Sequence, residues 1–95
     1  MKHHTYRILV EHVADKDGNP VADRSLSFTV TNHDEITEIV ERIRNTHQFE
    51  GDDAVAFSVG LKLFSEVMLK NKGHPLFTEF RAHLMAFMKK LKALT

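Results

Sequence analysis

Two segments near the start of the chain alternate between apolar and polar residues, which is the pattern of half-buried β-strands. They span residues 5–13 and residues 25–31. The apolar residues on one side of each segment are Tyr6, Ile8, Val10, Leu26, Phe28 and Val30. Residues 15–20 between the segments are rich in turn formers, so we expect the strands to pair as an antiparallel hairpin.

The rest of the chain has the apolar spacing of three amphipathic helices. We predict the first from a cap at Asn32 to about Asn45, and the second from a cap at Asp52 or Asp53 to Lys72, ended by a left-handed Gly73. The third begins at Pro75 and carries an apolar stripe, as does the second. The residues of the two stripes are Ala54, Phe57, Leu61, Phe64 and Met68, and Phe77, Phe80, Leu84, Phe87, Met88 and Leu91.

The predicted fold class is α+β, an antiparallel β-hairpin followed by three helices in the order ββααα, with the helices packed on one face of the hairpin. We expect the stripes of the second and third helices to be buried against each other and against the hairpin. A length of 95 residues indicates a single domain spanning residues 1–95. Gly60 lies on the apolar side of the second helix, which predicts a close approach of another backbone there; a spacer without a role is the alternative.

The composition excludes several functional classes. The chain has no Cys, which leaves no disulfide, thiolate nucleophile or Cys-containing zinc site. No apolar run resembles a signal peptide or a membrane span, so the expected location is cytoplasmic. The net charge of zero argues against nucleic acid as the main partner. That zero hides an asymmetry: residues 1–60 carry a net charge of −5 and residues 61–95 one of +5.

A resemblance extends over nearly the whole chain. The run FSVGLKLFSEVMLKNK at residues 57–72, followed by HPLF at 74–77, is similar to a family of short bacterial proteins catalogued only as a domain of unknown function. The opening MKHHTYR and the NHD at residues 32–34 share the likeness. The resemblance implies a bacterial source and a free-standing domain, and it carries over no activity and no functional residue.

We identify no catalytic, cofactor-binding or metal site. The only helical His or carboxylate pair at i and i+4 that includes a His is Glu79 with His83, and no Ser lies at a strained turn beside a base. The acidic pairs 34–35 and 52–53 mark helix starts, where capping explains them. The expected cofactor is therefore none.

The function is unknown from the sequence, and the leading hypothesis is a non-enzymatic protein-interaction module. It could form a homodimer, by strand pairing or helix contact, or bind an unknown protein partner. The candidate interaction surface consists of leftover apolar residues and a basic stripe: Leu9, Val13, Val55, Val59, Arg81, Lys89 and Lys92. The alternative is a small enzyme or small-molecule binder with a pocket between hairpin and helices, lined by Tyr6, His12, His33 or His47.

Overall fold

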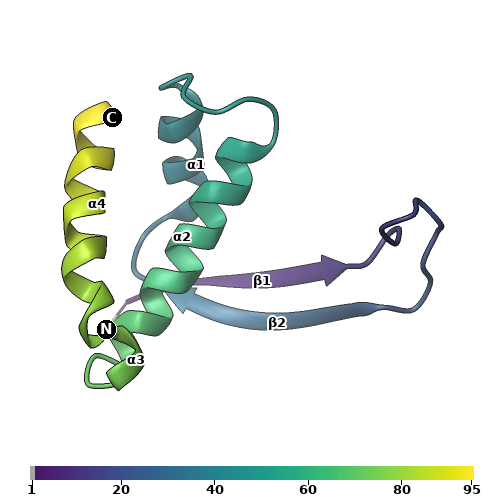
Figure 1. Ribbon diagram of the computed structural model, residues 1–95, viewed down its shortest axis with the longest axis horizontal. Helices are drawn as coiled ribbons and strands as arrows, with labels where there is room; N and C mark the ends of the chain where they lie inside the picture. The colour runs from purple at the N-terminus through teal and green to yellow at the C-terminus, as the bar shows by residue number, and fades with distance from the viewer. Residues whose placement is uncertain (1) are drawn as a thin grey trace. The chain divides into compact units, whose positions relative to one another are not determined.

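Residues 2–95, the part of the chain that the computed structural model describes, contain two β-strands followed by four helices (Figure 1). They divide into a hairpin unit that ends at His33 and a helical unit, Asp34–Thr95. The predicted α+β class, an antiparallel hairpin followed by helices, is confirmed. That residues 1–95 act as one domain stays a prediction.

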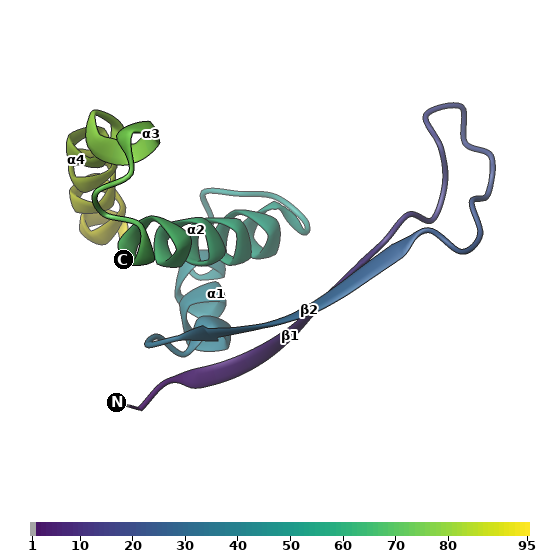
Figure 2. The same cartoon turned by 90° about the horizontal axis from the view of Figure 1, so that it is seen from below.

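The hairpin pairs β1 (His4–Glu11) with β2 (Ser25–Asn32) in antiparallel register. Both views show the two strands running side by side (Figures 1 and 2). The register places the apolar residues of one strand opposite those of the other: Tyr6 faces Val30, Ile8 faces Phe28 and Val10 faces Leu26. Such cross-strand apolar pairs stabilise a sheet, and they follow directly from the alternation in the sequence.

The tip of the hairpin is organised by one carboxylate. Asp15 Oδ1 accepts hydrogen bonds from the backbone N–H groups of Asp17 and Asn19, at 3.0 and 2.9 Å. Gly18 supplies the positive φ of 86° that the turn requires. The bond from the Asn19 backbone is the main reason that the pKa of Asp15 lies below its ordinary value of 3.8.

Helix α1 (Ile36–Arg44) begins three residues later than a cap at Asn32 would place it. Asn32 does not cap the helix because β2 extends to it and α1 begins only four residues later. Glu35 is the cap instead, and its Oε1 accepts from the N–H of Thr37 at 3.1 Å.

Helix α2 (Asp53–Lys70) ends two residues before the predicted position, and Gly73 is not left-handed. The side chain of Asn71 explains the early end. Its Nδ2 donates to the carbonyl of Val67 at 2.7 Å, which is the acceptor that the next N–H of a continuing helix would use.

The predicted third helix is two helices, α3 (Pro75–Thr78) and α4 (Phe80–Leu94). Pro75 does lie in the first turn, as expected, and His74 Nδ1 accepts from the N–H of Leu76 at 3.1 Å. The interruption follows from Thr78, whose hydroxyl donates to the Pro75 carbonyl at 3.1 Å. In a continuous helix that carbonyl would accept from residue 79, so the side chain competes for it.

The helical unit has a small core. Helix α1 packs against α2, and Ser58 is fully buried in α2, where its hydroxyl donates to the Ala54 carbonyl at 2.6 Å. The buried apolar residues among those described are Ile36, Ile43, Ala54, Met68 and Leu84. Only the last of them comes from α4, so α4 adds little to this core.

Candidate functional site: an apolar groove between α2 and α4

An open groove of about 500 Å³ separates α2 from α4. After the α3 turn, α4 runs back at an angle to α2, and the two helices diverge with distance from α3 (Figure 1). Four positions of α2 at i, i+3, i+4 and i+7 form one wall, and four of α4 with the same spacing form the other, so each wall is a single helical face. The lining residues are Phe57, Gly60, Leu61 and Phe64 on α2, and Phe80, His83, Leu84 and Phe87 on α4.

Aromatic contacts bridge the groove at both ends. Phe57 meets Phe87 with ring centroids 6.0 Å apart, and Phe64 meets Phe80 at 5.7 Å, both edge to face. The order of these pairs shows that the two helices run in opposite directions. Edge-to-face pairs contribute about 0.5–1.5 kcal/mol each beyond the area that they bury, which is enough to hold α4 in place at two points.

Gly60 lies on the α2 wall of the groove, between Phe57 and Phe64. A Cβ atom built at Gly60 would meet no atom within 4 Å. The predicted close approach of another backbone at this glycine is therefore wrong within the described chain. Gly60 instead widens the space between the two aromatic pairs.

The expectation that the two apolar stripes bury each other is wrong at the groove. Phe64, Phe80 and Phe87 keep 40%, 42% and 41% of their surface exposed, whereas Leu84 between them keeps 8%. The rings touch at the ends of the groove, and their remaining surface faces the open space. Four of the five phenylalanines of the stripes thus line a groove that is accessible from outside.

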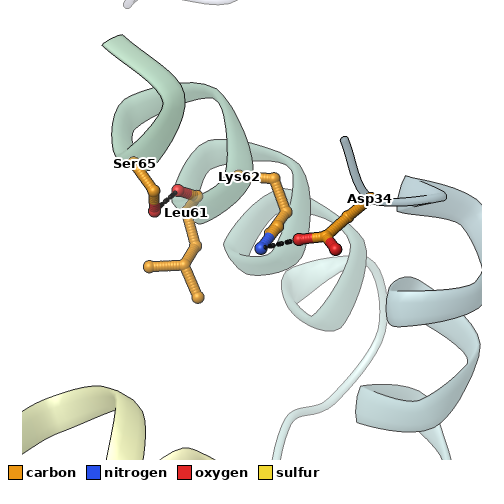
Figure 3. A network of polar contacts seen from close by, with 4 residues as sticks. All are labelled: Asp34, Leu61, Lys62 and Ser65. Atoms are coloured by element: carbon orange, nitrogen blue, oxygen red, sulfur yellow. Dashed lines mark hydrogen bonds and ion pairs between the residues drawn. The ribbon is translucent and has the colours of Figure 1, made fainter. Parts of the chain in front are cut away.

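The far side of α2 carries polar contacts that fix the helix to the start of α1. Lys62 Nζ lies 2.5 Å from Asp34 Oδ2, with 12% and 33% of the two side chains exposed. Figure 3 shows Lys62 reaching Asp34 while the neighbouring Leu61 extends toward α4. The hydroxyl of Ser65 donates to the Leu61 carbonyl at 2.5 Å. The Ser65 bond lies within α2, so the Lys62–Asp34 ion pair is the contact of the two that links α2 to the segment before α1.

The groove offers little for catalysis. His83 is its one titratable lining residue, and it is exposed. The buried hydroxyl of Ser58 is committed to a backbone carbonyl of its own helix. Within residues 2–95, no group of three or more His, Asp or Glu side chains is placed to hold a metal ion. Apolar contact is therefore what this site can supply.

The candidate surface residues are spread over several elements. Leu9 and Val13 belong to the hairpin unit and are 64% and 67% exposed. Val55 and Val59 are half-buried on α2. The exposed cations of the basic stripe are Arg81, Lys89 and Lys92 on α4. None of the seven lines the groove, and their role as an interaction surface stays a prediction.

The residues proposed for a small-molecule pocket also lie elsewhere. His12, His33 and His47 are exposed, and Tyr6 is half-buried on β1. None of the four lines the groove. The residues that line the groove were predicted from the sequence as two apolar stripes and not as a binding site. The spacing of a stripe does not show whether a neighbouring helix covers it.

No described helix has the length and apolar content that crossing a membrane would require.

Residues 4–93 match the model of a family described as "Domain of Unknown Function with solved-structure structure" (DUF3861). The chain is also similar to a crystal structure of a protein of unknown function from the bacterium Pectobacterium atrosepticum. The two are 38% identical with a TM-score of 0.84, over 97% of this chain and 99% of the other. No curated protein matches.

Proposed function

Because the chain belongs to the DUF3861 family, which is described as a domain of unknown function, we propose from its geometry that it is a non-enzymatic protein-interaction module. Its binding site is the groove between α2 and α4, and its ligand is the apolar face of a helix. The observation that carries this proposal is the exposure of about two fifths of Phe64, Phe80 and Phe87 around a hollow of about 500 Å³.

The length of the groove suits a helix. Phe57 and Phe64, which mark its ends on α2, are seven residues apart, or about 10.5 Å along the helix axis. An amphipathic helix presents apolar side chains at i, i+3 or i+4, and i+7 over the same distance, and docking of such a helix into a hydrophobic groove is a common recognition mode. Aromatic walls are typical of the buried centre of such interfaces.

A second candidate function is the binding of a small hydrophobic molecule. The volume of about 500 Å³ lies within the usual range for ligand sites, about 300–1,000 Å³. Such sites also place several polar groups to orient the ligand, whereas His83 is the one polar lining residue here. The helix-binding proposal needs no such groups, and we prefer it.

Photo-crosslinking of the full chain tests the proposal. A photoreactive phenylalanine analogue at Phe64 is irradiated in bacterial cells, and the adducts are mapped by mass spectrometry. We expect adducts with a polypeptide segment that has apolar residues at helical spacing. The matched control carries the analogue at Leu76, which is 72% exposed outside the groove. Adducts with lipids or metabolites alone would favour the second candidate, and equal labelling at both positions would contradict both.

For the compartment we propose the cytoplasm. The charged fraction of 27% is typical of a chain in an aqueous compartment and supports this proposal. Cell fractionation followed by detection of the native chain tests the location.

A further inference from the structure

We infer that the occupant of the groove is a second copy of this chain, which rests on the proposal that the groove binds protein. In this homodimer, the groove face of one copy packs against the same face of the other. The helices α2 and α4 of both copies then form a four-helix bundle, in which the half-exposed phenylalanine rings of one copy fill the hollow beside Gly60 of the other.

Both units carry exposed apolar residues, and the hollow distinguishes the groove. On the hairpin, Val10, Leu26 and Phe28 share one face of the sheet and are exposed. On the helical unit the exposed rings of Phe64, Phe80 and Phe87 surround one concave site. A single self-complementary surface is what a two-fold interface requires.

The charge distribution supports a second copy as well. Residues 34–60 carry seven acidic and two basic residues, and residues 61–95 carry seven basic and two acidic residues. Along α2, Asp52 and Asp53 mark the acidic start, and Lys70 and Lys72 the basic end. A two-fold axis perpendicular to α2 lays the acidic start of each helix beside the basic end of the other. Exposed ion pairs are weak, so they set the direction of the contact, and the apolar groove supplies its strength.

Sedimentation equilibrium of the full chain over a range of concentrations tests this inference. We expect a species of twice the chain mass in the wild type and a monomer in Phe64→Glu, with circular dichroism showing that the variant is folded. The matched controls are Leu76→Glu, outside the groove, and Leu9→Glu, on the hairpin; both should remain dimeric. A monomeric wild type at high micromolar concentration would overturn the inference. So would a dimer that Leu9→Glu dissociates and Phe64→Glu does not.

Crosslinking gives a second readout that does not require replacing an aromatic side chain. The chain has no Cys, and Gly60 has room for a side chain. With a short bismaleimide, Gly60→Cys should yield a product of twice the chain mass, and Leu76→Cys should not. The reverse pattern, or no product from either, would overturn the inference. A monomer whose Phe64 photo-adducts map to a different polypeptide would overturn the homodimer and leave the proposed function standing.

Discussion

A methyl group added at Gly60 would meet no atom within 4 Å, and the backbone there is that of a regular helix. Glycine inside a helix is less stable than alanine by about 0.5–1 kcal/mol. We therefore predict that Gly60→Ala raises the free energy of unfolding by about this amount. Urea denaturation in dilute solution, where the monomer dominates, measures the change.

Gly51 provides the control for this substitution. It too has no atom within 4 Å of an added Cβ, but its φ of +58° is one that alanine adopts at a cost. Gly51→Ala should therefore lower the free energy of unfolding. If Gly60→Ala also lowered it, another backbone would lie close to Gly60, and the hollow described here would be wrong.

The carboxylate of Asp15 makes the order of the hairpin tip depend on pH. Its pKa in the folded chain lies below 3.8, chiefly because of the hydrogen bond from the Asn19 backbone. A lowered pKa means that the carboxylate stabilises the folded tip above pH 3.8, and that this contribution is lost as the pH falls through the lower folded value. We predict that the amide shifts of Asp17 and Asn19 in NMR spectra titrate together below pH 3.8.

The variant Asp15→Asn is the matched control for this titration, because it keeps the shape of the side chain and removes the charge. In this variant the acid-dependent change of the Asn19 amide should disappear. A midpoint in the wild type at or above 3.8 would contradict the role given to these two hydrogen bonds.

At the scale of elements, the break between α3 and α4 depends on Thr78. Its hydroxyl occupies the Pro75 carbonyl, which is the acceptor that residue 79 would use in a continuous helix. We predict that Thr78→Ala allows the Glu79 N–H to bond that carbonyl, so that exchange of the Glu79 amide slows. Amide exchange followed by NMR measures this, with Thr95→Ala as the control at the far end of α4. Unchanged exchange at Glu79 would assign the break to another cause.

The presence and type of most elements could be predicted from the sequence, since alternation and helical spacing persist over many residues. Their ends could not, because single side chains decide them. Asn71 ends α2 by bonding the Val67 carbonyl, and Glu35 rather than Asn32 caps α1 because β2 already uses Asn32. Such competition between side chain and backbone depends on geometry that the order of residues alone does not give.

The residues of the candidate site could be predicted from the sequence as apolar stripes, but the open groove between them could not. Periodicity places Phe57, Phe64, Phe80 and Phe87 on two helical faces, and the structure keeps them there. Periodicity does not give the distance between the faces. That distance depends on contacts between the two faces, which the aromatic pairs make at the two ends of the groove.

For the whole molecule, the small number of buried apolar residues is the main energetic fact. Five such residues are buried in the described chain, and three of the largest rings remain two fifths exposed. A chain of this size is marginally stable even with an ordinary core. Burial of the groove by a second copy adds the apolar contact that the single chain lacks, so we expect folding and association to be coupled.

The urea midpoint of the wild type and of Phe64→Glu, measured over a hundredfold range of protein concentration, tests this coupling most directly. When a folded dimer unfolds to two chains, such a range changes the free energy of unfolding at the midpoint by about 2.7 kcal/mol per dimer. We predict that the wild-type midpoint rises with concentration and that the midpoint of Phe64→Glu does not. A wild-type midpoint that is independent of concentration would contradict the account. So would a loss of about 3–5 kcal/mol in dilute Phe64→Glu, which would make Phe64 a residue of the chain's own core.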